Sequence, residues 1–399
     1  MSVVTLEEFL EILNEEQHLD LAKLRNYARH GIHPQVRGEV WLYLLGVLSS
    51  DKSQEMTAVR SKFLEYESVS KRIPGVEKQI RTEVLRYFRQ RMETHQISQH
   101  RDGASMLRNF RAVSSAQSLG DSSESLPTLS KIKETEHPCF PRILPSTQYG
   151  LSTMRSNSNI DDSELISEQR KLSQSVENVL CAYLNRHLIA TNTPSSSQKR
   201  SLYDSTYSSM QIKNHPEYPW LQNASGSNNL ELDEFHPSLV YLCAPFAQCV
   251  RAEAGMYFAF EKLMAMIEEY NQTHPLSKRV ASFMTLFRTT LPELHEYFEA
   301  EEVDLLSVAT SWLQHLLARE MQMDDLMRLW DTYFAVPDLL DLHLFVCLAI
   351  LTYCKDALED LDRSETMSML CCLPPLDVDR IISDAVNIRL SLEHDEMYE

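Results

Sequence analysis

Apolar side chains recur every three or four positions along most of this chain, and that spacing is the strongest constraint on its fold. Residues 6–13 show it near the beginning and residues 305–316 near the end. Such spacing gathers apolar side chains on one face of an α-helix. Alternation of apolar and polar residues, which a half-buried strand needs, lasts only a few positions, and no internal repeat is visible. The sequence therefore predicts an all-α protein.

The composition agrees with that class and excludes several kinds of function. Gly makes up only 9 of 399 residues, so the Gly-rich loops that bind phosphates or dinucleotides are not expected. Acidic residues outnumber basic ones by 57 to 38, for a net charge of −19. Because contact with nucleic-acid phosphates requires clustered Lys and Arg, we expect no nucleic-acid binding. The sequence also lacks the motifs of common hydrolases, metalloproteases and P-loop enzymes.

Cysteine placement and hydropathy predict a cytoplasmic protein. The eight Cys form no C-x-x-C pair and have no His partner at zinc spacing, so no metal site is expected. The most apolar run, residues 339–353, is interrupted by Asp341 and His343 and is too short to span a bilayer. The first residues are acidic and amphipathic, unlike a signal peptide. We expect neither secretion nor a membrane segment.

Two polar tracts divide the chain. Residues from about 98 to 167 and from about 190 to 232 are rich in Ser, Asn, Thr and Pro, and we predict that both are disordered insertions. The sequence between them has apolar residues at helical spacing and predicts a short core helix. The predicted organisation is an N-terminal helix over 1–23, one interrupted domain over 24–361, and a C-terminal helical segment with an acidic tail over 362–399.

Helical patterns can be placed within the ordered parts. Residues 19–28 and 56–91 each have a helical pattern, and residues 239–270 predict two apolar helices separated around 251–255. Gly31 is suited to end one helix and Pro34 to begin the next.

Two short motifs carry most of the structural information. The first, R-x-x-x-W-x-x-L-L-G, contains Arg37, Trp41 and Gly46, and on a helix its Arg and Trp share one face. The second is L-W-D-x-x-F, and its Asp331 can accept a charge-assisted hydrogen bond from Arg37. We therefore expect the two motifs to form a buried fastening, a hydrogen-bonded pair of Arg37 and Asp331, that supports the fold. The second motif comprises Leu329, Trp330, Asp331 and Phe334.

These motifs, in this order, resemble those of the TBC domain, the all-helical module of Rab GTPase-activating proteins. The resemblance covers about residues 24–91, 176–188 and 239–361. It implies an all-α, TBC-type multi-helix domain interrupted by the two insertions, with a GTP-bound Rab-family small GTPase as partner and no cofactor of its own. It further implies a role in vesicle trafficking, with membrane association only indirect, through recruitment to endomembranes by a lipidated GTPase.

The resemblance also assigns an arginine finger. The family carries it in I-x-x-D-x-x-R, which matches Ile80, Glu83 and Arg86, with Glu83 in place of Asp. An inserted Arg stabilises the charge that develops on the γ-phosphate oxygens during GTP hydrolysis. A competing register on Arg81 places Lys78 where the acid belongs, so Arg86 is the expected finger.

The family's second catalytic element, the glutamine finger in Y-x-Q-G-M, is degenerate here. Proline stands where Gln is needed, and a Pro side chain has no donor or acceptor with which to orient water. Gln222 and Gln248 are the remaining candidates, although neither matches the motif and both are more typical of surface residues. The matched positions are Phe235, His236, Pro237, Ser238 and Leu239.

Two functions are therefore left open by the sequence. The first is a Rab GTPase-activating protein of weak activity, which acts in trans and is not itself a hydrolase. The second is a catalytically inactive TBC adaptor that binds a small GTPase or a protein complex in membrane trafficking.

The polar tracts also suggest regulation. Four serines follow basic residues, in a pattern that a kinase and then a phosphopeptide-reading protein could recognise. These predicted phosphosites are Ser114, Ser158, Ser173 and Ser201.

Overall fold

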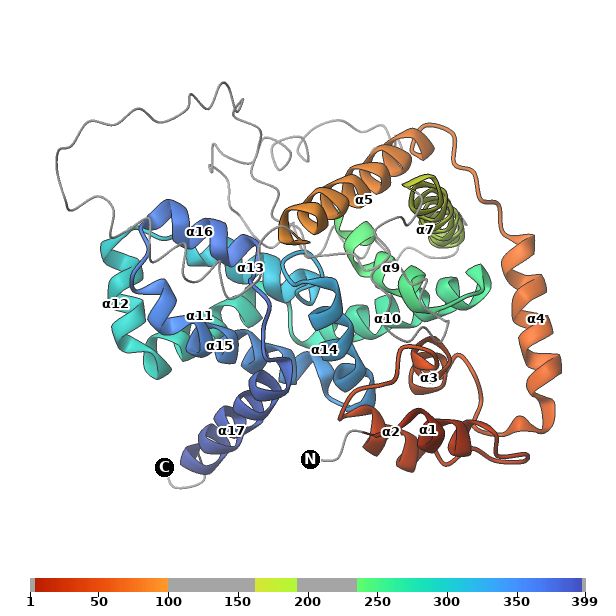
Figure 1. Cartoon of the computed structure of the whole chain (residues 1–399), viewed down its shortest axis with the longest axis horizontal. Helices are drawn as coiled ribbons and strands as arrows, with labels where there is room; N and C mark the ends of the chain where they lie inside the picture. The colour runs from red at the N-terminus through yellow and green to blue at the C-terminus, as the bar shows by residue number, and fades with distance from the viewer. Residues whose placement is uncertain (1–3, 100–161, 192–234, 397–399) are drawn as a thin grey trace. The chain divides into compact units, whose positions relative to one another are not determined.

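The computed structural model describes residues 4–99, 162–191 and 235–396, and within these ranges it is helical without a strand (Figure 1). The predicted all-α class is confirmed. The helices are α1 (Leu6–Leu13), α2 (Leu21–Ala28), α3 (Arg37–Leu44), α4 (Glu55–Ser68), α5 (Glu77–Gln99), α7 (Asp162–Thr191), α9 (Ser238–Cys249), α10 (Glu253–Thr273), α11 (Leu276–Thr290), α12 (Pro292–Ala300), α13 (Leu305–His315), α14 (Met323–Ala335), α15 (Leu339–Leu358), α16 (Arg363–Cys371) and α17 (Val378–Glu396), with the 3-10 helix η1 (Lys52–Gln54) before α4.

Contacts divide the chain into two compact units. The first contains the described residues up to 86, those between 145 and 282, and residues 331–340. The second contains the described residues from 87 onward in α5, residues 283–330, and those from 341 to 396. Helices α16 and α17 belong to the second unit, and the organisation into 1–23, 24–361 and 362–399 stays a prediction.

Local signals explain how the first unit begins. Thr5 and Glu8 form a capping box at the start of α1, and Asp20 caps α2 by accepting a hydrogen bond from the Lys23 amide. Helices α1 and α2 contact each other, and α2 contacts α3. Because α2 spans Leu21–Ala28, the predicted boundary at residue 23 falls inside a helix.

The helical pattern over residues 56–91 comprises two helices. Helix α4 ends at Ser68 and α5 begins at Glu77. Between them lie Pro74, which has no amide hydrogen to donate, and Gly75, whose φ of 97° lies in the left-handed region. By contrast, the predicted break within residues 239–270 is confirmed, because α9 ends at Cys249 and α10 begins at Glu253.

Helix α7 is the core helix expected between the two polar tracts. Val176, Val179 and Leu180 are fully buried on it, and it contacts α9 and α10. It runs from Asp162 to Thr191, so the predicted insertion boundaries at 167 and 190 fall within a helix. The remainder of both predicted insertions lies almost entirely outside the described residues.

The second unit contains a buried contact between α13 and α16. Trp312 is buried and its Nε1 donates to the Leu370 carbonyl at 3.0 Å, which joins α13 to α16. After α13, Leu316 and Leu317 adopt left-handed φ values of 51° and 62°, and the buried Trp330 Nε1 donates to the Leu316 carbonyl at 3.2 Å.

Within the described ranges, no helix has both the length and the apolar character needed to cross a bilayer.

Candidate functional site

The residue expected to be the arginine finger lies on the exposed side of α5. Ile80 and Val84 face inward, with 0% and 1% exposure, whereas the Arg86 side chain is 59% exposed. Its Nη1 atom is 3.4 Å from Glu83 Oε2, an i,i+3 pair at the surface. Because exposed pairs of this kind contribute little, Glu83 does not prevent the guanidinium from reaching a partner.

Arg81, the competing register, is already engaged. Its Nε lies 3.0 and 3.1 Å from the two carboxylate oxygens of Glu177, and its Nη2 lies 2.6 Å from Glu177 Oε1. The same Nη2 donates to Glu77 at 3.0 Å. A guanidinium held by two carboxylates is poorly suited to enter a partner's site, and the assignment of the finger to Arg86 stays a prediction.

The degenerate glutamine-finger positions form the start of α9. Pro237 is exposed and occupies the N-cap position, where it makes no side-chain capping bond. Phe235 and His236 are half-buried, and Ser238 and Leu239 are buried. His236 Nδ1 accepts the Ser238 amide at 3.3 Å, and burial lowers the pKa of His236 to about 4. His236 is therefore neutral near pH 7 and carries its proton on Nε2.

Gln248 does not take the place of the missing glutamine. Gln248 is buried, with 9% exposure, so its interpretation as a surface residue is wrong. It also lies at the far end of α9 from Pro237, and a rise of about 1.5 Å per residue separates the two positions by about 16 Å. Gln222 lies outside the described residues.

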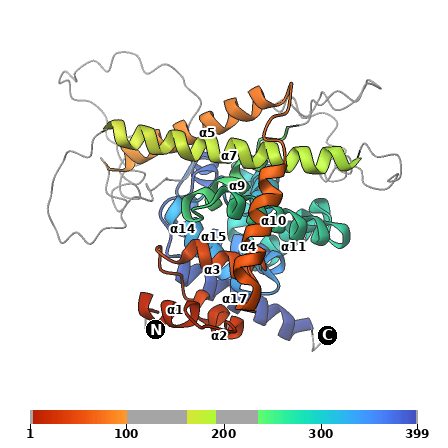
Figure 2. The same cartoon turned by 90° about the vertical axis from the view of Figure 1, so that its right-hand side faces the viewer.

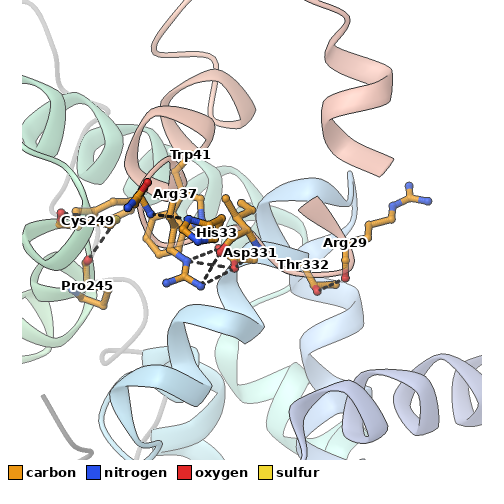
Figure 3. Close-up of polar contacts among 11 residues, drawn as sticks. Arg29, His33, Arg37, Trp41, Pro245, Cys249, Asp331 and Thr332 are labelled. Atoms are coloured by element: carbon orange, nitrogen blue, oxygen red, sulfur yellow. Dashed lines mark hydrogen bonds and ion pairs between the residues drawn. The ribbon is translucent and has the colours of Figure 1, made fainter. Parts of the chain in front are cut away.

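The expected fastening between the two motifs is present (Figure 3). Arg37 Nε donates to Asp331 Oδ1 at 3.0 Å and Oδ2 at 3.2 Å, and its Nη2 donates to Oδ2 at 3.1 Å. Trp41 Nε1 adds a bond to Oδ1 at 2.8 Å, and the Ile32 amide adds one to Oδ2 at 2.9 Å. Burial raises the pKa of the Asp331 carboxyl, while Arg37 and these other donors favour its charged form.

The other residues of the two motifs also support the fold. The Trp41 ring meets Phe246 and Phe334 edge-on, with ring centroids 5.7 and 4.9 Å away. Gly46 follows α3 with a φ of 69°, the left-handed conformation that commonly ends a helix at Gly. Leu329 and Trp330 are fully buried within the second unit.

One predicted phosphosite is corrected by the structure. Ser173 lies inside α7 with 6% exposure, and its Oγ donates to the Gln169 carbonyl at 2.8 Å. A kinase requires an extended, accessible serine, so Ser173 is not a phosphosite in this fold. Ser114, Ser158 and Ser201 lie outside the described residues.

Sequence reasoning missed the contacts that hold α7. Ser175 Oγ donates to Glu253 Oε1 at 3.0 Å, and Asn178 Nδ2 lies 3.2 and 3.3 Å from the two Glu253 oxygens. Tyr66 donates to the same carboxylate at 3.0 Å. No motif links these residues in the sequence.

Among the described residues, no group of three or more His, Cys, Asp or Glu side chains is arranged to hold a metal ion.

Comparison with known proteins places these features in a family. Residues 229–359 match the family model of the Rab-GTPase-TBC domain. Over 148 residues, the chain is 30% identical to human TBC1 domain family member 22A. This match covers 35% of this chain and 29% of that protein. It is 29% identical over 129 residues to the GTPase-activating protein gyp1 of Schizosaccharomyces pombe, covering 31% and 25% of the two chains. The matches thus span less than a third of these relatives.

A solved structure extends the likeness to the whole fold. The crystal structure of the Ypt/Rab-GAP domain of Gyp1p aligns with a TM-score of 0.50 and 19% identity, covering 96% of this chain and 98% of that one. The family match contains the second motif, from Leu329 to Phe334, whereas Arg37 and Arg86 lie before it. The chain therefore carries a match to the Rab-GTPase-TBC domain family over residues 229–359, and the Arg37–Asp331 fastening joins the first motif to this segment.

Proposed function

We propose that this protein is a Rab GTPase-activating protein that binds a GTP-loaded Rab and stimulates its hydrolysis weakly, with Arg86 as the arginine finger. The family match supports the class of activity, and a relative carries the name of a GTPase-activating protein. The observation that carries the proposal is the exposed Arg86 side chain, at the family's finger position on a helix whose opposite face is buried.

The weak activity follows from the start of α9. GTP hydrolysis needs an attacking water as well as neutralisation of charge on the γ-phosphate. Arg86 can supply the charge, but Pro237 cannot orient water, so this task falls to the glutamine of the Rab itself. Loss of one preorganised contact in a catalytic site typically costs about 10²-fold in rate.

The second candidate is an inactive TBC adaptor, which Pro237 favours. In both cases the membrane link would come from a lipidated Rab that recruits the protein to endomembranes. Phosphorylation of Ser114, Ser158 or Ser201 would add a phosphopeptide-reading protein as a further partner.

Single-turnover GTP hydrolysis across a panel of purified Rabs tests the proposal, with the unmodified chain and Arg86→Ala side by side. Because an arginine finger is worth roughly 10³ to 10⁵ in rate, we expect Arg86→Ala to abolish the stimulation. Its affinity for the GTP-bound Rab should stay within a few-fold. Arg89→Ala, at another exposed arginine of α5, is the matched control and should retain the stimulation.

Two other outcomes are informative. Binding of a GTP-bound Rab without acceleration of any Rab would establish the adaptor. Equal stimulation by Arg86→Ala and the unmodified chain would remove Arg86 from the mechanism.

A further inference from the structure

We infer that Glu177 on α7, acting through Arg81, is a positioning residue that holds the helix bearing Arg86 in its working orientation. The inference rests on the proposed function, and it assigns a role to two residues outside the finger motifs. It follows from the contacts between α5 and α7 within the first unit.

The contact between Arg81 and Glu177 is directional. Nε and Nη2 of Arg81 both face the Glu177 carboxylate, at 2.6 to 3.1 Å, so the guanidinium plane is fixed by more than one bond. Glu177 is only 8% exposed, whereas the Arg81 side chain is 51% exposed. The pair therefore joins a buried carboxylate on α7 to the partly exposed Arg81 side chain of α5. Glu77, also on α5, forms a second ion pair with Arg81.

The apolar contacts of α5 in this unit do not provide the same constraint. Ile80 and Val84 are buried, but dispersion and hydrophobic contacts have no preferred direction and tolerate a small slide or rotation. The pair between Arg86 and Glu83 lies within α5 and cannot fix the helix against anything else. Within the first unit, the bond from Arg81 to Glu177 supplies a directional restraint on α5, whereas Arg91, which donates to the Ala318 carbonyl at 2.8 Å, belongs to the second unit.

Helix α7 is a suitable anchor because it is held on other sides. Ser175 and Asn178, which flank Glu177 in the sequence, bond to Glu253 at the start of α10. Helix α7 also contacts α9, the helix that begins after Pro237. Figures 1 and 2 show α7 beside α5, α9 and α10. Helix α7 thus contacts α9, which follows Pro237, and is bonded to α5, which carries Arg86.

The distance from anchor to finger makes orientation matter. Arg86 lies five residues beyond Arg81, about 7.5 Å along the helix axis. A small rotation of α5 is enlarged at the end of the long Arg86 side chain. Since a displacement of about 1 Å in a catalytic group can cost about 10²-fold in rate, loss of the anchor should affect the chemical step more than binding.

The experiment compares Glu177→Gln, Arg81→Lys and the exchange Arg81→Glu with Glu177→Arg. Glu177→Gln removes the negative charge. Arg81→Lys keeps the positive charge but loses the planar guanidinium, which can donate two hydrogen bonds to one carboxylate. The control is Arg186→Lys, because Arg186 also extends from α7 but pairs with Glu65 on α4 and Glu261 on α10. For a Rab that the unmodified chain stimulates, the maximal rate and the protein concentration giving half that rate are measured separately.

We expect both single substitutions to lower the maximal rate at least about tenfold while the half-maximal concentration changes less than about twofold. The exchange should recover part of the rate, and Arg186→Lys should leave it unchanged. Hydrogen exchange of the α5 amides should quicken in the single variants without an equal loss of melting temperature, since a purely structural pair would change both together.

Unchanged maximal rates in both single variants would overturn the inference. So would a loss of rate that follows the melting temperature in every variant. Failure of the proposed function is distinguishable, because it would appear in the unmodified chain as the absence of stimulation before any substitution is made, and it would end the positioning role as well.

Discussion

At the scale of single residues, Pro237 stands where the glutamine-finger motif of the TBC domain has Gln. Its φ of −55° and ψ of −25° lie in the right-handed helical region, which a Gln adopts without strain. The side chain is exposed at the start of α9, so a longer residue has room. The backbone therefore tolerates the residue that the chemistry requires.

We predict that Pro237→Gln raises the stimulated single-turnover rate at least about tenfold, toward the 10² that one preorganised contact is worth. The reason is that a Gln amide can both donate to and accept from the attacking water. Pro237→Ala is the control, because it restores the backbone donor without the amide. Equal rates for the Gln and Ala variants would show that the loop geometry, rather than the missing side chain, limits activity.

Chemistry made some residue contacts predictable and left others hidden. The bond from Arg37 to Asp331 could be predicted, since a buried carboxylate needs a cation and the two motifs supply one of each. The bond from Arg81 to Glu177 could not, because 96 residues separate the partners and no motif connects them. Ser173 was misjudged because a basic-then-Ser pattern says nothing about burial within α7.

At the scale of elements, the sequence predicted helices better than their ends. The break between α9 and α10 was predicted from a change in pattern around Arg251. The break between α4 and α5 was missed although Pro74 and Gly75 mark it, because apolar spacing continued on both sides. Close approach between helices left no such signal. Gly38 in α3 lies so near α9 that a Cβ atom would sit 2.1 Å from the Cys249 carbonyl oxygen.

We predict that Gly38→Ala lowers the free energy of unfolding by about 1–3 kcal/mol, because the backbone of α9 would have to move. In an ordinary helix interior the same change stabilises by about 1 kcal/mol, so the sign itself is diagnostic. Gly46→Ala is the comparison: it meets no atom within 4 Å, and only its positive φ resists, at about 1 kcal/mol. Urea denaturation measures both. A neutral or stabilising Gly38→Ala would contradict the close contact of α3 with α9.

At the scale of the whole molecule, the two units differ in how they hold buried charge. In the first unit, Asp331 is surrounded by donors from Arg37, Trp41 and Ile32. In the second, Glu320 is 2% exposed, with Oε1 accepting from Ser311 at 2.5 Å and Oε2 lacking a hydrogen-bond partner among the described residues. Burial raises the pKa of Glu320 to about 7, although Arg319, Ser311 and Arg91 oppose it.

This difference predicts that pH acts on the second unit through Glu320. Its pKa in the folded state exceeds the ordinary value of 4.5, so protonation favours folding. The contribution is complete below pH 4.5 and is lost as the pH rises through 7. Glu320→Gln stays neutral, so its stability relative to the unmodified chain should rise by up to about 3 kcal/mol between pH 5 and pH 8.

Hydrogen exchange resolves the two units in that test. Amides of α13 and α16 should become better protected in Glu320→Gln at pH 8, whereas those of α9 should not, because only the second unit contains Glu320. Glu296→Gln, at an exposed Glu of α12, controls for removing a negative charge from a chain of −19. If both variants shift equally, net charge rather than burial explains the pH dependence. If neither shifts, Glu320 is ionised without cost, and the second unit must solvate its carboxylate.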